Sequence, residues 1–236
     1  MQTKQNEIPA NEQGFFNLMS LAITALVALP VGIACLVLGF GLGDNPCVMC
    51  WAERITMIAI SLIALFIIRY GLKPGYLAAL LLMACWGIFN GFIHYSLDGT
   101  FGGYLDIKQG FGLEILGAHT QFCVMVVDFC VIIFLAFIFL FSKNLGLIMQ
   151  KSSNGVYGNF LSYLPLGKFA NLVFIVIILA NCVQAFIASG PPPYLGSSTP
   201  PRMSIDPSKW FWEKDHWDSS LDFRFDWNPE LPDLAK

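Results

Sequence analysis

The chain has 236 residues, of which 56% are hydrophobic and only 12% are charged, and its mean hydropathy is +0.64. This composition is typical of a membrane protein and excludes an ordinary soluble core. The formal net charge is -3 and no cluster of Lys or Arg is present, so nucleic acid is not a credible partner.

The apolar runs of the chain predict five membrane-spanning helices. Crossing a hydrocarbon core of about 30 Å takes about 20 apolar residues. Residues 15–42 supply the first such run, and Pro30 inside it predicts a bend. The polar residues before it lack the features of a cleaved signal peptide, which favours an N-terminal tail. The other four spans are predicted at residues 51–68, 76–95, 122–141 and 169–188.

This pattern predicts an all-α membrane protein, with a four-helix transmembrane bundle, a fifth transmembrane helix and an aromatic-rich tail. Because the tail is rich in Trp and Pro, we expect a small ordered extension on the membrane surface or on a partner; the alternative is a flexible tail with scattered anchors. The predicted parts are a cytoplasmic N-terminal tail at 1–14, the bundle at 15–142, a cytoplasmic connection at 143–168, the fifth helix at 169–188 and an extracytoplasmic tail at 189–236.

Lysine and arginine residues predict the orientation of the bundle, because short cytoplasmic loops carry an excess of them. The loops on the side away from the N-terminus hold only Arg54 and Lys108. The N-terminus should therefore be cytoplasmic. With five spans, the C-terminal tail then faces the opposite compartment, where thiols can be oxidised. The basic residues on the N-terminal side are Lys4, Arg69, Lys73, Lys143, Lys151 and Lys168.

A Cys-x-x-Cys pair, Cys47 and Cys50, stands in the first outer loop, just before the second apolar run. We expect this pair to cap the outer end of a buried helix. The unpaired N–H groups and the positive dipole end of a helix N-terminus stabilise a thiolate and lower the cysteine pKa. Arg54, one helical turn beyond Cys50, adds a positive charge that is costly at membrane depth unless something polar binds it. These residues predict a reversible dithiol/disulfide couple beside an arginine-held electron acceptor.

Other interpretations of the pair stay open. Half of a metal site, a structural disulfide and two unrelated buried cysteines are the alternatives, although zinc normally takes four N or S ligands and no second close pair follows. The total of seven cysteines is odd, so at least one thiol is unpaired. Four cysteines lie inside apolar runs, where we expect small buried hydrophobes: Cys35, Cys85, Cys130 and Cys182.

The segment 46–54, Pro-Cys-Val-Met-Cys-Trp-Ala-Glu-Arg, resembles the disulfide bond formation protein B (DsbB) family of bacterial inner-membrane proteins. Members of that family share Pro-Cys-x-x-Cys followed by Glu-Arg at the start of the second helix. The layout of residues 15–142 is similar too, whereas the fifth span and the tail lie outside the four-helix pattern. The resemblance implies a thiol:quinone oxidoreductase whose Cys pair is reoxidised by a membrane quinone, either ubiquinone or menaquinone.

The resemblance also implies roles for four residues. Cys47 would exchange with the incoming thiol, and Cys50 would face the quinone and pass on the electron pair. Arg54 would hold a quinone oxygen and offset the negative charge that develops on it. His94, near the outer end of the third span, would line the quinone pocket, and His119, which enters the fourth span from the same side, is a candidate for the same pocket by its position. The alternative for His94 is an interfacial histidine satisfied by water or backbone.

The chain departs from the family in its second outer loop. Members with the full relay carry a second cysteine pair there, whereas residues 96–121 contain no cysteine. Cys123 and Cys130 follow, but seven helical residues rise about 10 Å, beyond the ~5.5 Å Cα spacing of a disulfide. Either the incoming thiol reacts directly with Cys47, or Cys123 alone or a cysteine of another protein takes the relay step.

Two carboxylates near the predicted site need partners. We expect Glu53 to orient the helix end or to pair with a nearby group. Asp128 lies about two turns into the fourth span, where an unpaired carboxylate is costly, so it is protonated, faces a wet cavity or pairs with a cation. Arg54 is the obvious cation, and Asp128 as its partner would tune it or relay a proton. If the helix starts later, Asp128 lies near the headgroups instead.

Together these features predict a bacterial inner-membrane thiol:quinone oxidoreductase. It would reoxidise a periplasmic thioredoxin-like dithiol protein and deliver electrons to the quinone pool of the lipid bilayer. One alternative is a non-catalytic accessory subunit whose tail docks a larger membrane complex, favoured by the cysteine-free second loop and the Trp-rich tail. The other is a membrane protein that handles copper(I) with Cys47 and Cys50 as soft ligands.

Overall fold

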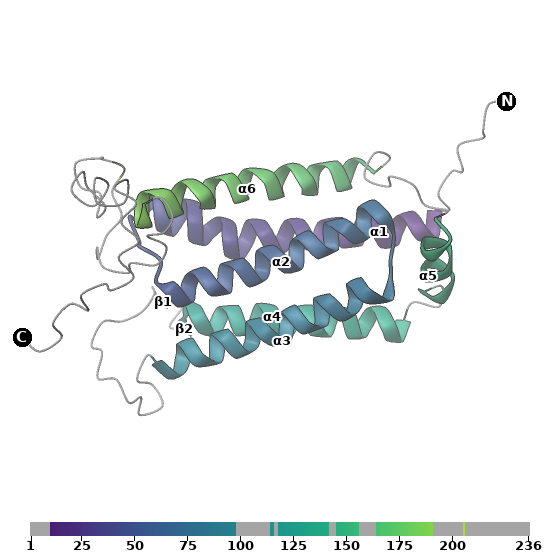
Figure 1. The fold of residues 1–236 in the computed structure, drawn as a ribbon, viewed down its shortest axis with the longest axis horizontal. Helices are drawn as coiled ribbons and strands as arrows, with labels where there is room; N and C mark the ends of the chain where they lie inside the picture. The colour runs from purple at the N-terminus through teal and green to yellow at the C-terminus, as the bar shows by residue number, and fades with distance from the viewer. Residues whose placement is uncertain are drawn as a thin grey trace, which may run out of the picture.

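The computed structural model of the protein describes residues 10–97, 114–115, 118–141, 145–155, 164–190 and 205. Five helical segments of this part are long and apolar enough to cross a membrane. They run side by side in one bundle, with α6 along one flank and the α3–α4 pair along the other (Figure 1). The prediction of an all-α membrane protein is confirmed.

The first span consists of two helical segments of different winding. The α-helix α1, Ala10–Leu26, continues as the π-type helix η1, Val27–Gly41, which contains Pro30. Proline has no N–H and its ring clashes with the carbonyl four residues back, so an α-helical hydrogen bond to Leu26 is lost there. The sequence predicts an interruption at this proline, and the structure shows it as a change of winding.

The other four spans begin and end within a few residues of their predicted bounds. A tight turn joins the second span to the third: Gly71 has a φ of +81°, and its N–H donates to the Ile67 carbonyl. Such a φ favours glycine because it has no Cβ. These helices are α2, Val48–Tyr70; α3, Pro74–Leu97; α4, Thr120–Phe141; and α6, Pro165–Ser189.

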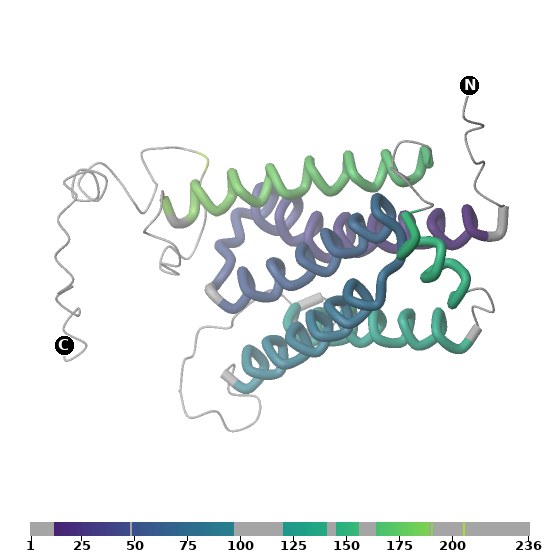
Figure 2. Tube along the Cα trace, turned by 45° about the vertical axis from the view of Figure 1, so that its right-hand side comes forward, coloured from purple at the N-terminus to yellow at the C-terminus, as the bar shows by residue number. Residues whose placement is uncertain are grey.

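A short helix that the sequence did not predict closes one end of the bundle. It is α5, Leu145–Ser153, and it lies across that end in both views (Figures 1 and 2). Lys151 in α5 forms an ion pair with Glu12 in α1, so the short helix is tied to the first span. Two two-residue strands, β1 Glu114–Ile115 and β2 Ala118–His119, pair antiparallel just before α4.

The described basic residues of the predicted cytoplasmic side gather at the α5 end. Arg69 is in the last turn of α2, Lys73 precedes α3, and Lys168 is in the first turn of α6. Cys47 lies at the N-terminus of α2, which is the opposite end of that helix from Arg69. This distribution agrees with the predicted orientation, which stays a prediction. Lys4, Lys108, Lys143 and the Trp-rich tail beyond residue 190 lie outside the described residues.

The apolar runs supply both a core and an outer surface. Phe16, Ile23 and Met57 are buried among the helices, whereas Leu82 and Leu140 are exposed on the outside, as expected where lipid replaces water. The prediction of buried cysteines therefore holds for Cys35 and is wrong for three others. Cys85, Cys130 and Cys182 are exposed on the bundle surface, because an apolar run does not separate core-facing from lipid-facing positions.

Helices α3 and α4 pack closely through two glycines of α3. A Cβ added at Gly91 would meet the side chain of Met125, and one added at Gly87 would overlap the carboxylate of Asp128. Glycines four residues apart let membrane helices approach at short range. Helix α3 therefore contacts both α2 and α4, and its last turn lies beside Cys47.

Candidate functional site

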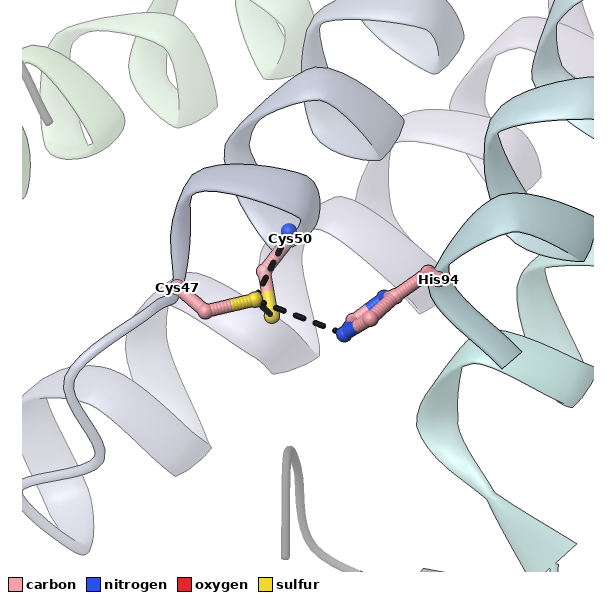
Figure 3. A group of neighbouring side chains, drawn as sticks. All are labelled: Cys47, Cys50 and His94. Atoms are coloured by element: carbon pink, nitrogen blue, oxygen red, sulfur yellow. Dashed lines mark hydrogen bonds between the residues drawn. The ribbon is translucent and has the colours of Figure 1, made fainter. Parts of the chain in front are cut away.

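Cys47 is the N-cap of α2, as the sequence predicts. Its backbone is extended, with φ -68° and ψ 168°, and its Sγ accepts a hydrogen bond from the Cys50 N–H at 3.1 Å. The two sulfurs lie 2.7 Å apart (Figure 3). A covalent S–S bond is about 2.05 Å long, so the two thiols are free and in direct contact. Formation of a disulfide requires only a small movement of one side chain.

His94 reaches this pair from the last turn of α3. Its Nε2 lies 3.5 Å from the Cys47 Sγ, and its side chain is almost completely buried. The ring points at the two sulfurs from the neighbouring helix (Figure 3). The interfacial histidine considered as an alternative is thus not what the structure contains, since His94 is bonded to side chains of α2.

Glu53 holds the other nitrogen of this ring. Its Oε1 lies 2.8 Å from the His94 Nδ1, and both side chains are buried. With Nδ1 turned to this carboxylate, Nε2 is the ring nitrogen that faces the sulfur. Cys47, His94 and Glu53 therefore form a line of thiol, imidazole and carboxylate. This meets the expectation that Glu53 pairs with a nearby group.

The surroundings of Cys47 favour its thiolate. The pKa of Cys47 is lowered to about 4, mainly by the hydrogen bond with the Cys50 thiol; burial opposes this, and the bond with His94 adds to it. The backbone N–H of Cys50 contributes as well, as expected at a helix N-terminus. A thiolate at neutral pH is the form that attacks disulfides and departs from them.

Arg54 points away from His94, toward η1 and α6. Its Nη1 donates to the Gln184 Oε1 at 2.6 Å and to the Asn181 Oδ1 at 3.5 Å, and its Nη2 donates to the Ala34 carbonyl at 3.0 Å. The guanidinium also lies over the Trp51 ring, 5.1 Å from its centroid. The buried arginine thus has the polar contacts that its depth requires.

The two amide side chains that contact Arg54 are functional candidates that the sequence analysis missed. Asn181 and Gln184 are buried polar residues that follow the apolar run of residues 172–180 in the fifth span. A spacing of three residues puts them on the same helix face. That pair of amides was the available signal, but nothing in the sequence relates it to Arg54.

Asp128 does not pair with Arg54, so that hypothesis is wrong. Within the described residues, neither carboxylate oxygen has a hydrogen-bond partner, although the side chain is completely buried. The guanidinium faces α6 and η1, whereas Asp128 packs against Gly87 of α3. Because α4 begins at Thr120, Asp128 is two turns inside the span and not at the headgroups.

The remaining candidates are less informative. The backbone of His119 pairs with Glu114 in the short β ladder, but its side chain lies outside what the structure describes. Cys123 is half-buried and Cys130 is exposed, and both are free thiols on α4.

The bundle also contains an apolar cavity of about 370 Å³, one side of which is formed by α1 and η1 and the other by α4. Leu26 and Pro30 line it from the first span, Ile60 from α2 and Phe134 from α4. Ile60 lies six residues beyond Arg54, which is a rise of about 9 Å along α2. A hydrogen-bond donor near the thiols and an apolar space deeper in the bundle fit a quinone with a polyprenyl tail.

The same thiols are suited to a soft metal. The Sγ atoms of Cys47 and Cys50 and one ring nitrogen of His94 lie within 4.8 Å of one another. Glu53 on the other nitrogen is the outer partner that metal-binding histidines usually have.

Comparison with protein families gives one match: residues 16–103 match the family described as disulfide bond formation protein DsbB. The matched segment includes most of the first span and all of α2 and α3, with Cys47, Cys50, Glu53, Arg54 and His94. The comparisons with curated proteins and with solved structures found no match.

Proposed function

We propose that this protein is a thiol:quinone oxidoreductase. The match of residues 16–103 to the DsbB family supports a disulfide-forming membrane oxidoreductase in general. The observation that carries the proposal is the contact between the Cys47 and Cys50 sulfurs at the N-terminus of α2, with His94 on one side. Arg54, at the start of the same helix, supplies the charge for an electron acceptor.

The first half of the reaction is thiol–disulfide exchange with a dithiol protein. A thiolate of that protein attacks the Cys47 sulfur of the oxidised chain, the Cys47–Cys50 bond breaks, and Cys50 departs with the electron pair. The second thiol of the partner then attacks the mixed disulfide and releases Cys47 as a thiolate. The partner leaves as a disulfide, and the chain keeps two electrons and two protons. The hydrogen bonds from Cys50 and His94 favour this departure because they stabilise the Cys47 thiolate.

The second half returns the chain to its disulfide. A quinone, when bound, would supply the two-electron oxidant: Cys47 and Cys50 would give up two electrons and two protons and become the disulfide, and the quinone would be released as a quinol. Arg54 is suited to bind an oxygen on which negative charge develops, because its own partners are neutral oxygens. His94, held by Glu53 through Nδ1, is placed to take the Cys47 proton at Nε2, from which it can donate back to the thiolate. The cavity beside Ile60 would hold the apolar tail.

The test is anaerobic addition of a quinone analogue to the reduced protein, followed by trapping and mass spectrometry of the Cys47–Cys50 peptide. Two thiols should be lost from that peptide for each quinol formed. Cys50→Ser should form no quinol, and Cys182→Ser, an exposed thiol of α6, should behave as wild type. Retention of both thiols in the wild-type protein would refute the proposal.

We further propose a bacterial inner membrane, an outer-facing Cys pair and a periplasmic thioredoxin-like dithiol protein as the electron donor. The Cys pair lies at the end of the bundle opposite Arg69, Lys73 and Lys168, which supports that orientation. Since no cysteine occurs in residues 96–121, the proposal has the donor react directly with Cys47.

A second candidate function, copper(I) handling, is favoured by one observation: His94 adds a third donor to the two thiolates. Thiolate and imidazole are ligands that copper(I) accepts. If the protein handles copper, the reduced form should bind one copper(I) per chain and show no thiol loss with quinone. Cys47→Ser should abolish that binding. The redox proposal predicts instead that the reduced form binds no stoichiometric copper(I) and loses both thiols with quinone.

A further inference from the structure

The fifth span lies outside the family match, yet it contacts the candidate site. The match covers residues 16–103, whereas α6 extends over Pro165–Ser189. Two of its side chains, Asn181 and Gln184, bond to Arg54 inside that match. A helix absent from the matched segment therefore supplies contacts to the residue proposed to bind the acceptor.

The geometry of Gln184 is determined by the guanidinium. Arginine only donates, so the amide oxygen of Gln184 must face Arg54 and its nitrogen must face away. That nitrogen has no hydrogen-bond partner within the part of the chain that the structure describes, although Gln184 is completely buried. The amide is thus held through its oxygen by Arg54.

Gly39 of η1 makes the room for this amide. A Cβ added at Gly39 would overlap the Gln184 side chain, with Nε2 as the nearest atom. Close approach of η1 and α6 at this glycine thus brings the amide of α6 within reach of α2. Ala34, also in η1, contributes the backbone carbonyl on the other guanidinium nitrogen.

The contacts orient the guanidinium without cancelling its charge. All three acceptors are neutral oxygens, and among the residues that the structure describes no carboxylate forms an ion pair with Arg54. Asp44 is a described carboxylate whose charge acts on the guanidinium without bonding to it. A carboxylate in the place of Gln184 would hold the same geometry and neutralise the cation. The choice of amides therefore preserves a positive charge for a ligand oxygen.

We infer that Gln184 and Asn181 of the fifth span are positioning residues of the acceptor site, which hold the Arg54 guanidinium in place and leave its charge available to a quinone oxygen. The inference rests on the proposed function. It assigns the fifth span a part in acceptor binding in addition to any role in anchoring the chain.

The test is equilibrium binding of a water-soluble quinone analogue to the protein with its Cys47–Cys50 disulfide formed. This oxidised protein cannot reduce the analogue, so binding is measured without reaction. Gln184→Leu removes the contact, and Gln184→Glu keeps the shape but cancels the charge. Each should raise the Kd by about ten- to a hundredfold, as expected when a hydrogen bond to a charged group is lost or its charge is neutralised. Cys182→Ala, an exposed position on the same helix, should leave the Kd unchanged.

Thermal unfolding in the same detergent checks that each variant is folded. If Gln184→Leu does not fold, Gln184→Glu still tests the inference. The pH dependence of the Kd separates charge from packing: Gln184→Glu should regain affinity as acid protonates the new carboxylate. A Kd for Gln184→Glu within twofold of wild type across pH would overturn the inference and leave the proposed function intact. A wild-type protein that binds no quinone would overturn both.

Discussion

His94 Nε2 lies 3.5 Å from the Cys47 Sγ, although 47 positions separate the two residues in the chain. The contact forms because α3 returns antiparallel to α2, so that the last turn of one helix meets the first turn of the other. Glu53, six positions after Cys47, bonds to the other ring nitrogen, Nδ1, and so determines that Nε2 is the nitrogen that meets the thiol. The reactivity of Cys47 therefore depends on two helices at once.

The reactivity of Cys47 should persist at low pH. Its pKa of about 4 leaves it deprotonated at neutral pH, and protonation removes the nucleophile only as the pH falls through that value. The alkylation rate should therefore stay level down to about pH 5, whereas an ordinary cysteine slows tenfold per pH unit below about 8.5. The measurement is mass spectrometry of the Cys47 peptide after pulses of a water-soluble reagent. A midpoint near 8 would contradict the assigned thiolate.

His94→Gln should raise the pKa of Cys47, because glutamine replaces the ring without its capacity for positive charge. At pH 5 the alkylation rate should fall about twofold if the pKa rises to about 5, about tenfold if it rises to about 6, and about tenfold for each further unit. Phe92→Leu, an exposed change on the same helix, is the control and should match wild type. An unchanged pH profile in His94→Gln would show that the imidazole does not act on this thiol.

Replacement of Glu53 should lower the stability of the bundle. Glu53→Leu leaves the buried His94 ring without its carboxylate, and breaking a buried pair in this way costs about 3–5 kcal/mol. Glu53→Gln keeps an acceptor oxygen and should lose less. Thermal unfolding in detergent checks the order wild type, Gln, Leu. Equal Tm values for all three would mean that the pair adds nothing to the fold.

Gly87→Ala should destabilise the bundle through Asp128. The added methyl group would overlap the buried carboxylate, and overpacking of this kind costs about 1–3 kcal/mol. Asp128→Ala in the same protein removes the overlapping atoms, so the double variant should lose less stability than the two single effects added together. Gly75→Ala, where nothing lies near the new methyl group, is the control. Simple additivity would exclude this contact.

A thiol reagent that does not cross membranes should label reduced Cys47 from the outer side of intact inner-membrane vesicles of native orientation. The same reagent should fail on Cys47 in inverted vesicles, because the basic residues predict a cytoplasmic α5 end. A cysteine introduced at Lys73, at the opposite end of α2, should show the reverse pattern. Labelling of Cys47 only in inverted vesicles would reverse the proposed topology.

The sequence by itself determined the spans and the position of the thiol pair. Runs of about 20 apolar residues are required wherever a backbone crosses hydrocarbon, so the helices follow from local composition alone. Cys47 at the start of α2 follows from its neighbours in the same way, since the cap depends on adjacent N–H groups. The need of Arg54 for polar contacts was also evident from its depth.

Only the tertiary structure decided which groups meet. Gln184 reaches Arg54 across 130 positions of chain, and Asp128, the partner expected from depth, faces a different helix. Depth in the membrane is a property of the sequence, but the direction of a side chain around its helix depends on how neighbouring helices pack. For the same reason Cys85 and Cys182 lie outside and Cys35 inside, although all three occur in apolar runs.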